Sequence, residues 1–483
     1  MQPSDPCPVA TGWAKSFLWL ALAVACFHAA YYASGKFPAA GLLIIGYAFG
    51  LVQLASQPSV RRAFYFGFAA GFLCAAPQLY FFWKIFSVAA IVLWIVFAFW
   101  IGLFTAIVCG CLRRWGKVRA MWLVPFIWTG LEYFRSELYY LKFSWLNIGY
   151  ALPVPLNGIG MYGIGFVVFL LPVICHYRPF IRISFREMLF LDILLIIILA
   201  VLLPLLSVTQ YQGLDTLYIA GIQMEFPPVG ILPEALDKAL KKNPDAQLFV
   251  LSEYTLDGAV PDSLKQWCRE NSRFLVVGGK DFVTNDVYYN TAFVVGTNGE
   301  VVFKQAKSVP IQFFHDGLPA PKQEVWNSPW GKIGICICYD LSYTRVTDAL
   351  IEQGAQLLIV PTMDVDEWGR HEHRLHARVA PVRAAEYGVP IFRLASSGIS
   401  QAIRDNGQVI AQTKFQVNGD ILAARPHLPP KGTLPWDRWL APVCVAVTAI
   451  VIMALTTIFL VCSSRQTANR ALSEQPKANG LTG

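Results

Sequence analysis

The amino-acid sequence predicts a membrane protein in which a bundle of transmembrane helices is combined with one α/β domain outside the bilayer. The 483 residues are 55% hydrophobic and only 14% charged, a balance too apolar for a soluble enzyme. The charged residues also avoid several windows that are long enough to cross a bilayer as helices. Over residues 209–436 the pattern changes to short apolar strands that alternate with polar helices, which is typical of an α/β domain.

Eight windows are candidates for transmembrane helices. Six of them contain no Asp, Glu, Lys or Arg: 16–35, 37–60, 63–83, 85–112, 143–177 and 439–464. A seventh window, 188–208, carries only Asp192. An eighth, 118–138, is apolar from Ala120 to Leu131 and then contains three charged residues. We therefore predict an eight-helix transmembrane bundle.

Basic residues indicate the orientation of these helices. Four clusters of Arg and Lys fall in alternate loops: 61–62, 113–119, 178–186 and 465–470. Because cytoplasmic loops carry an excess of Lys and Arg, we expect these loops to lie inside the cell. The predicted parts are a seven-helix transmembrane domain (12–208), an extracytoplasmic catalytic domain (209–436), a C-terminal transmembrane helix (437–464) and a cytoplasmic tail (465–483). This topology also accounts for the net charge of +8, so no nucleic-acid partner is expected.

The elements of the α/β domain follow from short apolar runs bounded by turns. Strands are predicted over 217–223, 247–252, 274–278, 292–296, 300–303, 331–337, 356–361 and 390–395, and helices over 233–242, 261–271, 344–353 and 372–387. The turns Asn298-Gly299 and Asp405-Asn406-Gly407 predict two hairpins. Only three of the eleven cysteines fall in this domain, so we expect free thiols rather than disulfides.

Cys338 is the candidate nucleophile. The apolar run 331–337 reads as a buried strand, and Cys338 lies where that strand ends. Catalytic side chains of α/β folds gather at the carboxyl ends of strands, where a thiol can face a cleft. The backbone N–H of Tyr339 can then face a developing oxyanion. The alternative is that Cys336 and Cys338 are small core residues, as most free cysteines are.

A carboxylate and two lysines are candidates to act with this thiol. Glu253 follows a predicted strand, and Lys304 and Lys307 follow the Asn298-Gly299 turn. A carboxylate can take the thiol proton and return it to a leaving group. An ammonium group is expected to lower the pKa of the thiol and to stabilise a negatively charged tetrahedral intermediate.

The α/β domain resembles the nitrilase superfamily, whose members use a Glu-Lys-Cys triad in an α-β-β-α sandwich. The motifs that carry the resemblance are Leu251-Ser252-Glu253-Tyr254, Ile337-Cys338-Tyr339-Asp340, Arg383-Ala384-Ala385-Glu386 and Ser397-Gly398-Ile399-Ser400. The resemblance implies Glu253, Lys307 and Cys338 as the catalytic residues, with Tyr339 and Asp340 as support for the oxyanion.

Seven spans before such a domain and one after it resemble the apolipoprotein N-acyltransferase family. The segments 144–150, 163–166 and 221–223 also resemble that family. The tentative substrate-binding residues are Glu132, Arg135, Trp145 and Gln223. Glu132 and Arg135 lie three residues apart on a predicted helix, where they can pair with each other or bind a lipid headgroup.

The resemblance implies an acyltransferase of the bacterial inner membrane, with its catalytic domain on the outer face. An acyl chain would pass from a membrane phospholipid to Cys338 as a thioester, and then to the α-amino group of a diacylglyceryl-cysteine on an apolipoprotein. No cofactor and a monomeric state are expected. The alternatives are a membrane-anchored amidase of the nitrilase type, with water as acceptor, and a non-catalytic scaffold that binds lipoproteins.

The sequence departs from the family pattern around the triad. Ser252 replaces the proline before the catalytic Glu, and Gln305-Ala306-Lys307 replaces an aromatic-x-Lys motif, which leaves Lys304 as a rival to Lys307. The family's second acidic residue has two candidate replacements, Gln312 and Asp316.

Three histidines were also considered as metal ligands. His371, His373 and His376 have no acidic or cysteine partners at a convergent spacing in the sequence. We therefore predict that they line a helix face and that the protein has no metal site.

Overall fold

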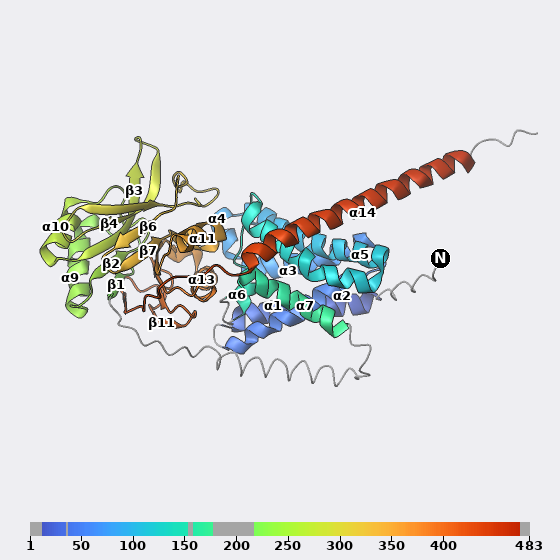
Figure 1. The fold of residues 1–483 in the computed structure, drawn as a ribbon, viewed down its shortest axis with the longest axis horizontal. Coiled ribbons are helices and arrows are strands. Elements are labelled where there is room, and N and C mark those ends of the chain that lie inside the picture. Colours follow the sequence, from blue (N-terminus) through green and yellow to red (C-terminus); the bar gives the residue numbers. More distant parts are fainter. Residues whose placement is uncertain (1–11, 35–36, 153–157, 177–216, 474–483) are drawn as a thin grey trace, which may run out of the picture.

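A bundle of apolar helices and an α/β domain lie end to end in the computed structural model of the protein (Figure 1). The structure describes residues 12–34, 37–152, 158–176 and 217–473. The predicted span 188–208 lies outside the described residues.

The helical part agrees with the apolar windows in outline. Its helices are α1 (Trp13–Ala33), α2 (Ile44–Ala55), α3 (Val60–Gln78), α4 (Phe81–Phe86), α5 (Ala89–Tyr133), α6 (Ile148–Ala151), α7 (Met161–His176) and α14 (Asp437–Ser473). A 3₁₀ turn (Pro38–Leu43) precedes α2, and a π-helical turn (Phe134–Leu138) continues α5. The predicted windows 63–83 and 143–177 are divided between α3 and α4 and between α6 and α7.

Four stretches of the described residues are long and apolar enough to cross a membrane: Trp13–Ala33, Pro38–Ala55, Ala89–Leu138 and Asp437–Ser464. The third stretch covers two of the predicted windows, and the chain bends between them at Gly116. This residue has a φ of 76°, which ends one helical segment and begins the next, and such a φ favours glycine. The eight-helix count is therefore not reproduced among the described residues.

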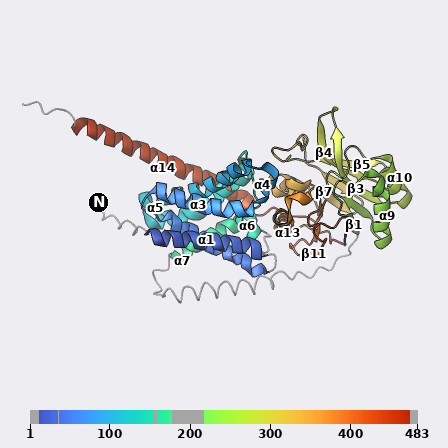
Figure 2. The ribbon, with the colours of Figure 1, turned by 180° about the vertical axis from the view of Figure 1, so that it is seen from behind.

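The outer surface of α14 is apolar. Ile450, Met453 and Phe459 are each more than half exposed on this helix, and lipid is the environment that such a surface requires. Two tryptophans near its first turn, Trp436 and Trp439, are 81% and 83% exposed, as in the aromatic belts of membrane proteins. Figure 2 shows α14 running from the α/β domain along the helical bundle.

The α/β domain contains two six-stranded sheets. The first has the order β12-β1-β2-β3-β4-β5, and the second has the order β11-β10-β9-β8-β7-β6. Parallel pairs occupy the middle of each sheet: β1 with β2, β2 with β3, β7 with β8, and β8 with β9. The strands are β1 (Ile219–Ile222), β2 (Leu248–Leu251), β3 (Phe274–Phe282), β4 (Tyr288–Val295), β5 (Val301–Ala306), β6 (Val325–Ser328), β7 (Gly331–Ile335), β8 (Leu357–Thr362), β9 (Ile391–Ala395), β10 (Gln401–Ile403), β11 (Val409–Gln412) and β12 (Ile421–Ala424).

Helices cover the outer faces of both sheets, and the predicted α-β-β-α sandwich is confirmed. The helices are α9 (Leu232–Lys242), α10 (Asp262–Asn271), α11 (Thr344–Glu352), α12 (Arg370–Ala377) and α13 (Val379–Tyr387). One buried core lies between the sheets, and a second lies between the first sheet and α9 and α10. The third core, beneath α11 and α13, is continuous with the core of the helical bundle. The second sheet therefore faces the membrane part through α11 and α13 (Figure 1).

Three details of the α/β domain differ from the prediction. The helix expected over 372–387 is two helices that meet at Arg378. Pro381 lies in the first turn of α13 and cannot donate a hydrogen bond to the preceding turn, so it favours a new helix start. The strands β6 and β12 were not predicted, because neither four-residue segment has a clear apolar alternation.

Candidate active site

Three strands deliver the predicted triad to one place. Glu253 follows β2, Lys307 follows β5 and Cys338 follows β7, so all three lie at carboxyl ends of strands. Each of the three is at most 2% exposed.

Lys307 lies at the centre of a buried cluster of charges. Its Nζ is 2.9 Å from Glu253 Oε1 and 2.7 Å from Asp316 Oδ2. The Asn290 amide donates to Glu253 Oε1 at 2.6 Å and to Asp316 Oδ1 at 2.8 Å. Buried charges are costly unless they are paired and hydrogen-bonded, and this cluster meets both conditions.

The rival candidates lie elsewhere. Lys304 is on the exposed side of β5, where its Nζ is 2.9 Å from Asp281 Oδ2. The Gln312 amide donates to the backbone oxygen of Tyr140 instead of approaching Lys307. Of the alternatives in the sequence, the structure therefore brings Lys307 and Asp316 to Glu253.

Cys338 has an unusual backbone conformation. Its φ is 52°, in the left-handed region that non-glycine residues rarely adopt and that is frequent at functional sites. The Asp340 carboxylate accepts hydrogen bonds from the N–H groups of Ile337, Ser308 and Val309 at 2.7 to 3.1 Å. Burial raises the pKa of Asp340 to about 6, although Lys307 and these N–H groups favour its ionised form. Asp340 thus connects the turn Cys338–Ser342, which we call the cysteine turn, to the segment that follows Lys307.

The thiol is not made acidic by its surroundings, which corrects the expectation from the sequence. Burial raises the pKa of Cys338 well above its usual value, and the negative charge of Glu253 raises it further. Lys307 lowers it by less than these two effects together. Burial also raises the pKa of Glu253, against the opposing charge of Lys307. The thiol is therefore protonated, and it donates to the Met363 backbone oxygen at 3.7 Å.

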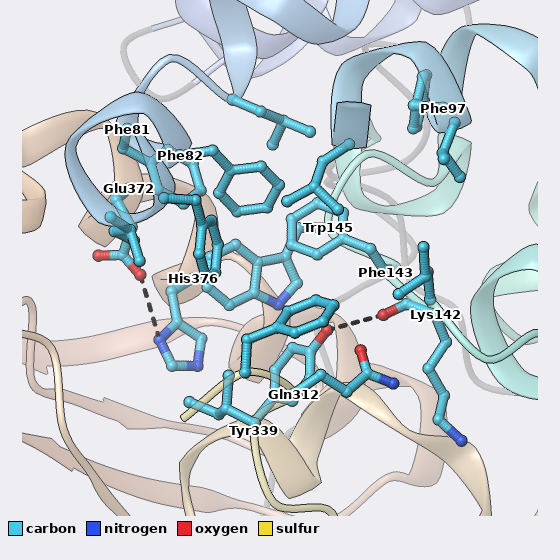
Figure 3. Close-up of a pocket in the computed structure, with 18 of the residues that line it drawn as sticks. Phe81, Phe82, Phe97, Lys142, Phe143, Trp145, Gln312, Tyr339, Glu372 and His376 are labelled. Carbon is cyan, nitrogen blue, oxygen red and sulfur yellow. Dashed lines mark hydrogen bonds and ion pairs between the residues drawn. The ribbon is translucent and has the colours of Figure 1, made fainter. Parts of the chain in front are cut away.

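Cys338 opens into an apolar cavity of about 120 Å³ between the α/β domain and the helical bundle. The lining side chains come from α4, α5, the segment 141–145 and the loop 311–314, and aromatic rings predominate. Phe81, Phe82 and Trp145 line one part of this space, and Tyr339 forms another wall (Figure 3). An extended hydrocarbon group is the ligand that such a lining suits.

Two of the predicted substrate-binding residues line the cavity. The Trp145 indole donates to Ser342 Oγ at 2.9 Å, which fixes the ring beside the cysteine turn. The guanidinium of Arg135 donates to Asn147 Oδ1 at 2.6 Å and lies 4.4 Å from the centroid of the Phe97 ring.

The other two predicted substrate-binding residues do not reach the cavity. Glu132 accepts a hydrogen bond from the Ile148 N–H at 3.0 Å and does not form the predicted ion pair with Arg135. Gln223 is fully buried inside the α/β domain, where its side-chain oxygen accepts from Ser400 and Thr413. The short spacing of Glu132 and Arg135 was misleading because each residue has its own partner in the loop before α6.

Acidic residues lie beside His376 in the fold, although none had a convergent spacing with the three histidines in the sequence. His376 Nδ1 is 2.6 Å from Asp364 Oδ1 and 3.9 Å from Glu372 Oε1. Asp364 follows β8 and is distant from the histidines in the sequence, so spacing did not reveal it. Its second oxygen is 2.7 Å from Arg393, which already supplies the positive charge that a metal ion would bring. His371, in contrast, contacts Gln78 in the helical bundle.

Asn290 was also missed by the sequence analysis. It lies in β4 between Tyr289 and Thr291, and its backbone oxygen accepts from the Lys307 N–H at 2.8 Å. Its place in the sequence gave no clear signal of this role.

Comparison with known proteins finds a family match in each of the two parts of the chain. Residues 24–174 match the N-terminal domain of apolipoprotein N-acyltransferases, and residues 224–425 match the carbon-nitrogen hydrolase family. The chain is 25% identical over 457 residues to the apolipoprotein N-acyltransferase of Geobacter metallireducens, which covers 80% of this chain and 86% of that protein. Identity to the enzyme of the same name from Shewanella oneidensis is 23% over 350 residues, covering 61% and 65% of the two chains.

A relative with another name matches a smaller share of the chain. The chain is 28% identical over 207 residues to the deaminated glutathione amidase of Bos taurus, covering 38% of this chain and 62% of that protein. With both domain matches in one chain, the protein belongs to the apolipoprotein N-acyltransferase family, within the nitrilase superfamily.

Proposed function

We propose that the protein transfers an acyl chain from a membrane phospholipid to the α-amino group of a diacylglyceryl-cysteine on an apolipoprotein. The observation that carries this proposal is the apolar cavity, which joins the Cys338 thiol to side chains of the helical bundle. A hydrophobic chain held by the bilayer can enter such a space and pack against its predominantly apolar lining.

In the first half-reaction the Cys338 sulfur attacks the ester carbonyl of the phospholipid. Glu253 takes the thiol proton as the carbon–sulfur bond forms, and then gives it to the departing oxygen of the lysophospholipid. The Lys307 ammonium and the Tyr339 N–H stabilise the tetrahedral oxyanion. Asp316 and Asn290 hold Lys307 and Glu253 in place, as their 2.6 to 2.8 Å contacts indicate.

In the second half-reaction an amine attacks the thioester and the Cys338 thiol is regenerated. The thioester must survive until the acceptor arrives, so the site has to exclude water. The aromatic lining of the cavity supports this requirement.

The proposed topology has eight transmembrane helices, a catalytic domain over 209–436 on the periplasmic side and both termini in the cytoplasm. The exposed Trp436 and Trp439 before the last span support a membrane interface at that position. An impermeant thiol reagent should label Asn298→Cys, at an exposed turn, but not Asn479→Cys, and the reverse preference would overturn this orientation. The enzyme is also proposed to act as a monomer.

The decisive experiment is intact-mass analysis of purified protein after incubation with phospholipid and no acceptor. We expect one acyl adduct that hydroxylamine removes. Cys338→Ala should abolish the adduct. Cys336→Ala is the matched control, because Cys336 is equally buried two residues away and should leave the adduct unchanged.

Other outcomes identify the alternatives. Continuous release of fatty acid without any amine would indicate an amidase-type hydrolase that uses water. No adduct and no release would indicate a binding scaffold. Acyl transfer by the Cys338→Ala protein would contradict the thioester mechanism itself.

A further inference from the structure

A second hydrogen-bonded pair faces the same cavity as the thiol. His376, on α12, lines the cavity and is only 3% exposed. Its Nδ1 is 2.6 Å from Asp364 Oδ1, and Asp364 Oδ2 is in turn 2.7 Å from the Arg393 guanidinium. The Trp145 ring stacks on the imidazole at 4.5 Å with an interplanar angle of 17°. The imidazole is thus fixed at its edge and across its face (Figure 3).

One dipeptide connects this pair to the triad. The Met363 N–H donates to Glu253 Oε2 at 2.7 Å, and the Met363 oxygen accepts from the Cys338 thiol at 3.7 Å. The next residue, Asp364, holds His376. The histidine is therefore positioned by the same chain segment that contacts the base and the nucleophile.

Glu253 and His376 are the two candidate proton acceptors, and they differ in how many hydrogen bonds they already accept. Both oxygens of Glu253 already accept hydrogen bonds, from Lys307, Asn290 and Met363. The Nε2 of His376 has no hydrogen-bond partner among the residues that the structure describes.

The tautomer of His376 follows from its partner. Although burial opposes ionisation, Arg393 and then His376 hold the pKa of Asp364 below its usual value, so its carboxylate only accepts hydrogen bonds. Nδ1 must therefore carry the proton, and Nε2 presents its lone pair to the cavity.

The charges around His376 keep it neutral at pH 7. Burial lowers its pKa below 6.5, with Asp364 raising it and Arg393 and His373 lowering it. Glu372 is also close, but burial raises the pKa of Glu372 well above its usual value, so it is a neutral acid.

We propose that His376, positioned by Asp364, takes the proton from the α-ammonium group of the acceptor in the second half-reaction, while Glu253 serves the thiol. This inference rests on the proposed function. An α-amino group has a pKa of about 8, so most of it is protonated at neutral pH and cannot attack. Nε2 accepts one proton and becomes part of an imidazolium that Asp364 stabilises. The free amine then attacks the thioester, its second proton passes through Glu253 to the departing thiolate, and the imidazolium releases its proton to water.

The test separates the two half-reactions. Acylated enzyme is prepared with phospholipid, a diacylglyceryl-cysteinyl peptide is added, and transfer is followed between pH 6 and pH 9. His376→Asn retains an N–H for Asp364 but lacks Nε2. We expect it to form the acyl adduct at the wild-type rate and to transfer up to about 30-fold more slowly at pH 6.5, because only about 3% of an amine with a pKa of about 8 is unprotonated there. The difference should shrink above about pH 8, where the acceptor amine loses its proton unaided.

A second acceptor distinguishes proton transfer from positioning of the peptide. Hydroxylamine is largely unprotonated at neutral pH, so it should release the acyl group from the wild-type enzyme and from His376→Asn equally fast. Asp364→Asn should show the same deficit at low pH, because the tautomer is no longer fixed. His371→Asn is the matched control and should behave as wild type, since His371 contacts Gln78 and Tyr32 outside the cavity.

Three results would overturn the inference: wild-type transfer by His376→Asn at every pH, an equal loss at every pH, or a loss of adduct formation. An equal loss would assign His376 a structural role, and a lost adduct would place it in the first half-reaction. If the wild-type protein itself formed no adduct, the proposed function would fail instead.

Discussion

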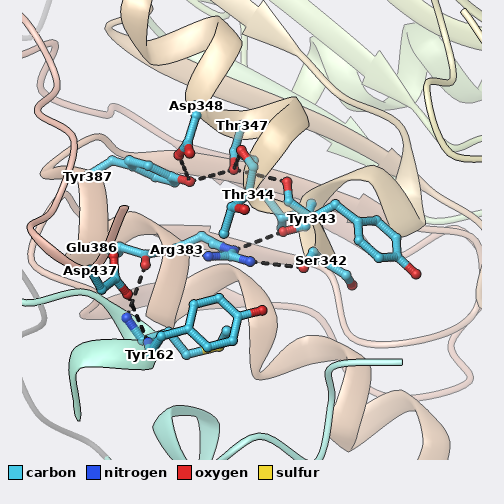
Figure 4. A network of polar contacts seen from close by, with 12 residues as sticks. Tyr162, Ser342, Tyr343, Thr344, Thr347, Asp348, Arg383, Glu386, Tyr387 and Asp437 are labelled. Atoms are coloured by element: carbon cyan, nitrogen blue, oxygen red, sulfur yellow. Dashed lines mark hydrogen bonds and ion pairs between the residues drawn. The ribbon is translucent and has the colours of Figure 1, made fainter. Parts of the chain in front are cut away.

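Two buried ionic networks in this protein have similar components but different environments. In the catalytic network, Lys307 is placed between Glu253 and Asp316, next to the cavity. In the network between the domains, Glu386 on α13 is 2.5 Å from Arg383 and 3.0 Å from Arg438. Figure 4 shows Glu386, Arg383 and Asp437 of this network. The first network contains the proposed catalytic residues, and the second joins structural elements.

The network between the domains extends from the α/β domain into the helical bundle. Arg438 near the start of α14 also contacts Asp348 on α11 at 2.7 Å and Asp437 at 2.6 Å. Asp437 accepts from the Tyr162 N–H at 2.8 Å, and Glu386 accepts from the Met161 N–H at 3.0 Å, both at the start of α7. These contacts attach the catalytic domain to the bundle at a fixed place.

The carboxylates of Glu386 and Glu253 differ in the direction in which their surroundings shift the pKa. Burial opposes ionisation of Glu386, but Arg438 and Arg383 together hold its pKa at about 2, so it is a permanent anion. The pKa of Glu253 is raised instead, because burial outweighs one lysine that it shares with Asp316. A guanidinium is always charged and binds several acceptors at once, which suits attachment, whereas a single ammonium leaves its carboxylate able to take a proton. The choice of cation therefore separates a structural pair from a catalytic one.

The largest expected effect separates activity from stability at Glu253. Glu253→Gln should slow formation of the acyl adduct by about 1,000-fold, within the range of general acid–base catalysis. The free energy of unfolding should change little, because Lys307 keeps Asp316 as its counter-ion. The measurements are adduct formation by mass spectrometry and unfolding in detergent. A large loss of stability with normal adduct formation would show that Glu253 has a structural role instead of a catalytic one.

Glu386→Gln should have the opposite effect. It leaves two buried guanidinium groups with one fewer anion, so we expect a loss of roughly 3 kcal/mol in the free energy of unfolding. The adduct formed per folded molecule should fall far less than in Glu253→Gln. Equal stability of the Glu386→Gln and wild-type proteins would show that the network is not needed for attachment.

Acid should weaken the domain attachment through the same residue. Since the pKa of Glu386 is about 2 in the folded protein and 4.5 ordinarily, its ionisation stabilises the fold above about pH 4.5. This contribution, roughly 3 kcal/mol, is lost as pH falls from 4.5 towards 2. Unfolding measured between pH 5 and pH 2.5 should show a component in the wild type that Glu386→Gln lacks. If the stability of the two proteins fell in parallel with pH, ionisation of Glu386 would not be the cause.

Lys307→Ala should slow adduct formation by at least about 100-fold, the scale of removing one oxyanion donor. Lys304→Ala is the matched control on the same strand and should have little effect, because its pair with Asp281 is exposed. If the two phenotypes were exchanged, Lys304 would be the catalytic lysine.

The smallest expected effect tests the choice of cation directly. Arg438→Lys keeps the positive charge but cannot contact Asp348, Glu386 and Asp437 together. We expect a loss of roughly 1.5 kcal/mol in the free energy of unfolding, about one hydrogen bond to a charged group. An unchanged stability would show that charge alone is sufficient at this position.

The sequence was sufficient to predict those helices, strands and site residues whose signal lies in a short stretch of the chain. Long apolar windows predicted α1 and α14 because a bilayer requires about 20 apolar residues in a row. Short apolar runs predicted most strands of the sandwich, and a residue at the end of such a run is at a sheet edge in any fold of this type. That reasoning identified Glu253 and Cys338 as neighbours, although they are far apart in the chain.

Tertiary structure decided which polar residues meet. Lys304 and Lys307 follow the same turn, but only the folded first sheet, which contains β2 and β5, places Lys307 beside Glu253. Asp364 reaches His376 from the end of another strand, so no spacing in the sequence revealed the pair.

The protonation state of the thiol was likewise inaccessible to sequence analysis. A lysine near a cysteine predicts an acidic thiol, yet the pKa of Cys338 is raised because burial and Glu253 outweigh Lys307. The sequence by itself determined the architecture and the chemical type of the nucleophile, since both depend on local periodicity and residue type. Only the folded chain determined the partners and charges of the site, because these depend on distance and burial in three dimensions.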